Sequence, residues 1–138
     1  MENWSGQPEV LALYAKHFKT GEVIPTELVE KLEKSKHFNQ GFETAEFIAA
    51  GFLDMYYHTI TKAEKIDVVA FEKSKLEQLG LIPEISVRYK STYFSHIFSG
   101  GYSSGYYSYT WAEVLDADAF NAFKEKGLFD KETANSFR

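Results

Sequence analysis

Apolar and polar residues follow a helical period along most of this chain. In the segment from Pro8 to Phe18, apolar residues recur every three to four positions, and the same spacing returns in later segments. Glycines follow several of these segments, and Asp67 and Asp130 precede two of them, as helix-capping residues do. The pattern predicts an all-α multi-helix bundle, with helices over about residues 8–18, 25–37, 43–61, 67–80, 106–126 and 130–138.

Two segments depart from the ordinary amphipathic pattern. Residues 43–61 carry apolar side chains on nearly every face. Because a helix that is apolar all round is normally buried on several sides, we expect this one to be the central helix of the bundle. In the connector at 81–90, Ile85, Val87 and Tyr89 alternate with polar residues, which allows at most a minor strand near 85–89.

The length of 138 residues is that of one domain. The first residues form a polar phrase that contains a tryptophan, and the last predicted helix has only begun when the sequence stops at Arg138. We therefore expect residues 1–138 to be a single helical domain that is a truncated portion of a larger protein. Apolar surface meant for the rest of that protein would be exposed and would favour self-association.

Charge and composition exclude several classes of function. The formal net charge is −5, from 20 acidic and 15 basic residues, which argues against a nucleic-acid partner. The absence of cysteine excludes disulfides, thiolate metal sites and a cysteine nucleophile. No apolar run approaches the roughly 20 residues of a membrane span, and no signal peptide precedes the first helix. We expect a soluble, cytoplasmic protein with no membrane partner.

The histidines do not form a metal-binding pattern. The four histidines lie far apart, and none belongs to the H-E-x-x-H pair that places two imidazoles on one metal ion. Two histidines lie four positions after a carboxylate, in the pairs Glu33–His37 and Asp54–His58. The members of each pair would share a helix face, and we interpret both pairs as structural. We therefore predict that this chain binds no metal by itself.

Aromatic residues and glycines concentrate near the C-terminal third. Seven of the 23 aromatic residues lie between Tyr93 and Tyr109. Glycines in this segment would let the backbone adopt positive φ and approach a ligand closely. Three of its tyrosines are spaced by four and three, so their hydroxyls would lie on one face of a helix and could donate to a carbonyl oxygen or an oxyanion. The candidate residues are His96, Gly100, Gly101, Tyr102, Gly105, Tyr106 and Tyr109.

Two other interpretations of this segment remain open. The tyrosines could pack in a core, with the glycines forming a turn, although buried tyrosines usually need a polar partner. The run from Gly100 to Gly105 could also suggest a phosphate-binding loop, but it lacks the Gly-Lys-Ser/Thr ending of that motif and does not clearly follow a strand.

The stretch from Tyr93 to Glu113, YFSHIFSGGYSSGYYSYTWAE, resembles the signature near the C-terminus of the thimet-oligopeptidase family of zinc metallopeptidases (family M3). The spacing from His96 to Tyr102 is similar to that of the bacterial peptidyl-dipeptidase (Dcp) branch. Other phrases agree along essentially the whole chain, namely Glu2-Asn3-Trp4, Phe38-Asn39-Gln40-Gly41-Phe42, Leu53-Asp54-Met55, Phe129-Asp130 and Phe137-Arg138.

This resemblance implies an all-helical, two-lobed peptidase that closes on short peptides in a deep channel. It implies that His96, Tyr102 and Tyr109 act in catalysis by stabilising the attacked carbonyl or gripping the substrate backbone. Tyr106 and the glycines at 100, 101 and 105 would contribute to substrate binding, and the glycine loop would close over the substrate. In the family, zinc is held by the two histidines of H-E-x-x-H and a later glutamate.

The sequence departs from the family pattern at the metal. It contains no H-E-x-x-H, and the third ligand would lie just before Met1. We therefore expect a C-terminal portion of a zinc-dependent peptidyl-dipeptidase or oligopeptidase, with zinc and the remainder of the parent peptidase as its partners and with no activity alone. The alternative is a non-catalytic peptide-binding module in which the aromatic loop grips a peptide and no chemistry follows.

Overall fold

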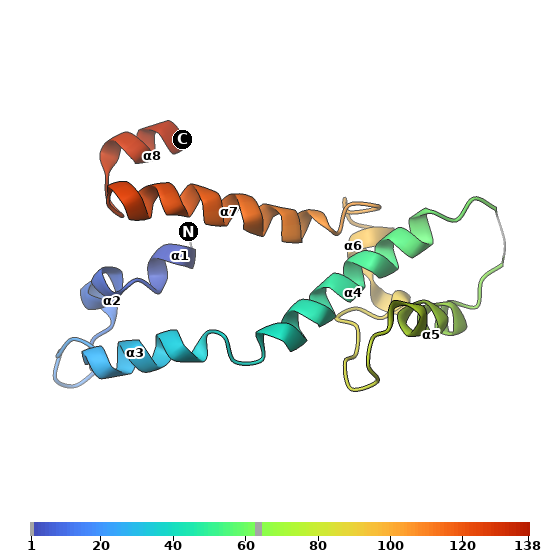
Figure 1. Cartoon of the computed structure of the whole chain (residues 1–138), viewed down its shortest axis with the longest axis horizontal. Coiled ribbons are helices and arrows are strands. Elements are labelled where there is room, and N and C mark those ends of the chain that lie inside the picture. Colours follow the sequence, from blue (N-terminus) through green and yellow to red (C-terminus); the bar gives the residue numbers. More distant parts are fainter. Residues whose placement is uncertain (1, 63–64) are drawn as a thin grey trace. The chain divides into compact units, whose positions relative to one another are not determined.

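The computed structural model describes residues 2–62 and 65–138, and it confirms the all-α prediction for them (Figure 1). No strand is present in these residues, so the minor strand allowed near 85–89 does not form; the amide of Ile85 instead bonds to the carbonyl of Ile82 in a turn. The elements are α1 (Glu2–Ser5), α2 (Pro8–Tyr14), α3 (Thr26–Ser35), α4 (Gln40–His58), α5 (Val68–Leu79), the 3-10 helix η1 (Ser91–Tyr93), α6 (Ser95–Phe98), α7 (Ser108–Lys126) and α8 (Lys131–Phe137).

The described residues form two compact units. One contains residues 2–38 and 115–138, and the other contains residues 39–114 apart from the two that are not described. The prediction that residues 1–138 make up one domain stays a prediction. None of the helices in the described ranges is long and apolar enough to cross a membrane.

In the first unit, Trp4 joins the start of the chain to α7. Its ring meets Phe120 and Phe123 edge to face, with ring centroids 4.6 and 4.8 Å apart. Its indole Nε1 donates a hydrogen bond of 2.9 Å to the carbonyl of Leu128. A tryptophan that packs its ring and also satisfies its N–H is a strong link between segments far apart in sequence. Helix α1, which contains Trp4, is not among the helices expected from the sequence.

Helix α2 is shorter than its apolar pattern predicts. It ends at Tyr14, because Ala15 has ψ 88° and leaves the helix, whereas the sequence predicts continuation to about Phe18. Lys16 then pairs with Val23 in an isolated antiparallel bridge, and Gly21 supplies the positive φ of 74° in the connecting turn. Backbone pairing across this turn replaces the last predicted helical turn.

In the second unit, α4 provides one wall of the core. Its buried Ala50 and Leu53 pack with Phe94, Ile97 and Tyr106 from the segment that carries the candidate site residues. Helix α5 packs against α4 and against η1. Asp67 caps α5 by accepting hydrogen bonds from two backbone amides, and Gly80 ends it at φ 81°, both as predicted.

Only part of the surface of α4 is buried, so the expectation that its apolar residues are covered on several sides is wrong. Ile48, Phe52 and Met55 remain partly exposed on one face. They line a groove of about 330 Å³ together with residues of α7, including Trp111, which is 60% exposed. An open apolar groove of this kind is a surface that a further element or molecule can cover.

Candidate functional site

The site segment begins at α6 and folds back on it through backbone hydrogen bonds. The amide of Gly100 donates to the carbonyl of Ser95, and the amide of Tyr102 donates to the carbonyl of His96 at 3.1 Å. A further turn closes between Tyr102 and Gly105 at 2.9 Å. The chain therefore reverses direction between His96 and Gly105 and brings the later tyrosines back over α6.

The glycines serve this turn differently from what the sequence predicts. Gly100, Gly101 and Gly105 do not have positive φ, so that expectation is wrong; the left-handed residue is Ser104, at φ 55°. Gly100 is required by space, because a Cβ there would lie 2.8 Å from the carbonyl oxygen of His96. Around Gly101 nothing lies within 4 Å of an added Cβ, so the backbone there is open to a ligand.

The structure brings the three candidate tyrosines together. The rings of Tyr102 and Tyr109 stack at 4.9 Å with 25° between their planes, and Tyr106 lies 5.1 Å from Tyr109. Their burial differs: Tyr106 is 2% exposed and belongs to the core, Tyr102 is 37% exposed, and Tyr109 is half-buried. Residues 102–107 are turns rather than helix, so tertiary folding, and not a shared helix face, gathers these side chains.

His96 lies against the same aromatic group. Its ring is 5.8 Å from that of Tyr106, 6.1 Å from that of Tyr102 and 4.7 Å from that of Tyr89. Its Nδ1 is a buried side-chain atom with no hydrogen-bond partner in the part of the chain that the structure describes. Buried polar atoms are nearly always paired, so an unpaired one in a cluster of hydroxyl-bearing rings is typical of a functional site.

The surroundings of Tyr106 and Tyr109 raise the pKa of both phenols. Side-chain hydrogen bonding with Tyr102, followed by desolvation, raises the pKa of Tyr109 to about 12. Burial also raises the pKa of Tyr106, and the nearby Tyr89 adds to the effect. A phenol that retains its proton is a hydrogen-bond donor, which is the form that can polarise a carbonyl oxygen.

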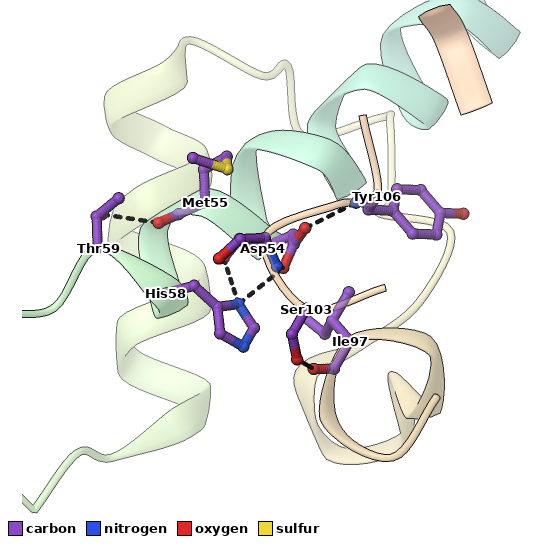
Figure 2. A network of polar contacts seen from close by, with 8 residues as sticks. Asp54, Met55, His58, Thr59, Ile97, Ser103 and Tyr106 are labelled. Atoms are coloured by element: carbon purple, nitrogen blue, oxygen red, sulfur yellow. Dashed lines mark hydrogen bonds and ion pairs between the residues drawn. The ribbon is translucent and has the colours of Figure 1, made fainter. Parts of the chain in front are cut away.

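A buried carboxylate on α4 binds backbone amides of the loop that carries the tyrosines. Figure 2 shows Asp54 accepting a hydrogen bond from the amide of Tyr106, and Asp54 also accepts one from the amide of Ser104. His58 lies one helical turn away and contacts the same carboxylate at 2.7 Å, so these two residues share a helix face as predicted. The other predicted pair does not share a helix face, because α3 ends at Ser35, before His37, and Glu33 pairs with Lys36.

A second carboxylate holds the chain just before the site segment, where η1 begins. Glu72 on α5 accepts hydrogen bonds from both the amide and the hydroxyl of Ser91, at 2.7 and 2.8 Å, and pairs with Lys90. Sequence patterns indicate no role for Glu72 and predict for Tyr89 only a possible strand. Tyr89 lies four positions before Tyr93, so its closeness in sequence connects it to the aromatic segment, whereas no local pattern connects Glu72 to Ser91.

The described residues do not form a metal site. Among residues 2–62 and 65–138, no three histidine, aspartate or glutamate side chains come together in a way that could hold a metal ion. The contacts of Asp54 and His58 are also those of a structural anchor, since the carboxylate is occupied by backbone amides. These residues therefore do not fit the zinc ligand set that the resemblance implies.

Comparison with known proteins identifies the family. The chain matches Peptidase family M3 over residues 1–138. It is 40% identical over 139 residues to the dipeptidyl carboxypeptidase of Escherichia coli (strain K12) and 38% identical over 138 residues to the oligopeptidase A of that organism, in each case over 99% of this chain and 20% of the relative. It is 41% identical to a probable cytosolic oligopeptidase A of Arabidopsis thaliana, over 100% of this chain and 20% of the relative. The chain spans about a fifth of the length of these relatives, and it belongs to peptidase family M3.

Proposed function

We propose that this chain is the substrate-binding and transition-state-stabilising part of a zinc-dependent peptidase that cleaves short peptides. The names of its relatives, dipeptidyl carboxypeptidase and oligopeptidase A, support a peptidase acting on peptides rather than on another substrate class. In this proposal the zinc ligands belong to a part of the protein outside these 138 residues.

The observation that carries the proposal is the stacked pair of Tyr102 and Tyr109 beside His96. Their rings lie 4.9 Å apart, with Tyr109 at the start of α7 and Tyr102 on a loop whose backbone is open at Gly101. When a peptide binds, the two phenols would release the hydrogen bonding between them and donate to one of its carbonyl oxygens. Donors that are already in place stabilise the negative charge that develops on this oxygen without reorganising during the reaction.

Each candidate residue has a distinct role in this proposal. Tyr102 and Tyr109 donate to the carbonyl oxygen. His96 adds a third polar side chain beside them, and its buried Nδ1 has no hydrogen-bond partner in the described part of the chain. Tyr106 is almost fully buried, so it acts by packing its ring against that of Tyr109. Its own contribution to substrate binding is therefore indirect.

The proposal is tested with Tyr102→Phe and Tyr109→Phe in the full-length protein that contains this segment. Removing one oxyanion-type donor lowers kcat by about a hundred- to a thousand-fold, whereas KM changes little because the donors act mainly on the transition state. Hydrolysis of a fluorogenic short peptide provides kcat and KM. Tyr93→Phe is the matched control, because Tyr93 is an exposed tyrosine of the same segment.

Two results would contradict the proposal. Unchanged kcat in both variants would remove the tyrosines from the chemistry. The isolated 138-residue chain with added zinc is expected to hydrolyse no short peptide, and robust turnover that a chelator abolishes would show that the zinc ligands lie within it.

A further inference from the structure

Asp54 is a fully buried carboxylate that binds the backbone of the tyrosine loop, residues 102–107. It lies on α4 with 0% exposure, and its two oxygens have different partners. Oδ1 accepts the amide of Ser104 at 3.0 Å, and Oδ2 accepts the amide of Tyr106 at 2.9 Å. Figure 2 shows the carboxylate directed at the loop backbone near Tyr106. Burying a carboxylate is costly unless it is hydrogen-bonded, so this side chain depends on the loop as much as the loop depends on it.

His58 completes the surroundings of this carboxylate. Its Nδ1 lies 2.7 Å from Asp54 Oδ1 and 2.9 Å from the backbone carbonyl of Asp54. Both neighbours are acceptors, so Nδ1 must carry a proton and donate to them. The His58 side chain is 23% exposed and lies on the solvent side of the pair. The imidazole thus orients the carboxylate through Oδ1, which it shares with the amide of Ser104, while the amide of Tyr106 binds Oδ2.

The anchored backbone is also the strained part of the loop. Ser104 adopts φ 55°, a conformation that is unfavourable for residues other than glycine and persists only where surrounding contacts enforce it. Its amide is one of the two that Asp54 binds. The second bound amide belongs to Tyr106, the residue at which the loop turns from the surface into the core. Asp54 therefore binds the amide of the strained residue and the amide of the residue at which the loop enters the core.

The position of the loop determines the position of the two stacked phenols, Tyr102 and Tyr109. Tyr106 is packed against Tyr109 at 5.1 Å, and Tyr109 is stacked on Tyr102 at 4.9 Å. A shift of the backbone at Ser104 or Tyr106 would move the ring of Tyr106, and because the three rings are packed together it would also displace the phenols of Tyr109 and Tyr102. Misplacing a donor by about 1 Å can cost on the order of a hundred-fold in rate.

We propose that Asp54 and His58 are positioning residues, whose carboxylate–imidazole pair holds the tyrosine loop in the conformation that presents Tyr102 and Tyr109. The effect on turnover rests on the proposed function, whereas the effect on the loop itself does not. The pair touches neither substrate nor the reacting atoms and acts only through the backbone of Ser104 and Tyr106.

Asp54 uses both carboxylate oxygens as hydrogen-bond acceptors, one for the amide of Ser104 and the other for the amide of Tyr106. In Asp54→Asn one oxygen becomes an NH₂ group, so one loop amide would face a donor. Asp67 offers a matched control, because it also binds two backbone amides, of Val69 and Ala70, but accepts both through Oδ1 alone. Asp67→Asn keeps that acceptor, so the same chemical change is harmless there.

The first measurement is amide hydrogen exchange in the 138-residue chain. In Asp54→Asn we expect exchange at Ser104 and Tyr106 to be about ten- to a hundred-fold faster, while the core amides of α4 change less. Asp67→Asn should leave both loop amides unchanged. Unaltered exchange at Ser104 and Tyr106 in Asp54→Asn would overturn the proposal.

A second pair of variants serves if Asp54→Asn does not fold. His58→Leu removes the imidazole donor at a partly exposed position and should accelerate exchange at Ser104, whose amide shares Oδ1 with His58. His58→Gln retains a side-chain donor and should restore part of the protection. Equal exchange in His58→Leu and the unmodified chain would count against the proposal.

The last measurement separates positioning from general stability. In the full-length protein, Asp54→Asn should lower kcat by about ten-fold or more with little change in KM, because the donors are misplaced while the substrate still binds. A variant that loses only global stability, with kcat per folded molecule unchanged, would overturn the positioning role. If the loop amides become exposed but Tyr102→Phe and Tyr109→Phe retain full kcat, the proposed function fails and the anchor remains.

Discussion

At the scale of single residues, the tyrosines of the site differ more than their shared spacing suggests. Tyr106 is part of the core, whereas Tyr102 and Tyr109 form a stacked pair that remains accessible. The contact between the two phenols has an electrostatic consequence, because a phenolate at Tyr109 would lose its hydrogen bonding with Tyr102 and lie close to other tyrosines. The raised pKa makes Tyr109 a phenol that keeps its proton at neutral pH.

This environment predicts a loss of stability at alkaline pH. The pKa of Tyr109 is about 12 in the folded chain and near its ordinary value of about 10 when unfolded. The contribution of Tyr109 to the free energy of unfolding is fully present below pH 10. It is lost as the pH rises towards 12, because the unfolded chain releases a proton that the folded chain retains. Urea unfolding at several pH values should show the free energy of unfolding falling over this range.

The comparison that identifies Tyr109 as a source is Tyr109→Phe, which cannot ionise. Its free energy of unfolding should fall less steeply over the same pH range. Part of the decline should remain, because burial also raises the pKa of Tyr57 and Tyr106. An identical decline in the variant and the unmodified chain would exclude Tyr109 as a contributor.

At the scale of elements, short-range signals explain where helices begin and end. Asp67 and Asp130 accept amides of the first turns of α5 and α8, and Gly80 and Gly127 adopt positive φ at the ends of α5 and α7. These four positions are predictable because a cap involves only residues two to four apart. Helix α2 ends early for the opposite reason, since Lys16 finds a backbone partner across a turn.

The cap of α5 provides a prediction at this scale. Asp67→Ala removes the acceptor for the amides of Val69 and Ala70 and should lower the free energy of unfolding by about 1 kcal/mol. Asp67→Asn should have nearly the unmodified stability, because asparagine is an equally good cap. Chemical denaturation followed by circular dichroism distinguishes the two. Equal losses in both variants would mean that charge, and not the cap hydrogen bonds, stabilises this end of α5.

At the scale of the whole molecule, the chain exposes more apolar surface than an isolated domain normally does. Phe18, Phe38 and Phe137 are exposed in one unit, and the groove between α4 and α7 leaves Phe52 and Trp111 accessible in the other. Contiguous exposed apolar surface marks places that another protein surface covers. The chain belongs to peptidase family M3 and spans about a fifth of the length of the relatives it matches, and in the function proposed above the remainder of the peptidase would cover this surface.

We therefore predict that the isolated chain self-associates. Sedimentation velocity should show a sedimentation coefficient that increases with protein concentration. Trp111→Asp places a charge in the apolar groove and should shift the distribution towards the monomer, whereas Lys62→Asp, at an exposed site outside the groove, is the control. A single monomeric species at high concentration would contradict the prediction.

What the sequence by itself determined is the set of features that depend on near neighbours. The helical class, the caps of α5 and α8, and the glycine and tyrosine motif with its family resemblance all follow from residues a few positions apart. The tertiary structure decided which face of α4 is buried, that Ser104 rather than a glycine takes the positive φ, and that Asp54 binds amides 50 and 52 positions away. Such contacts form only when distant segments pack together, so no local pattern of side chains contains them.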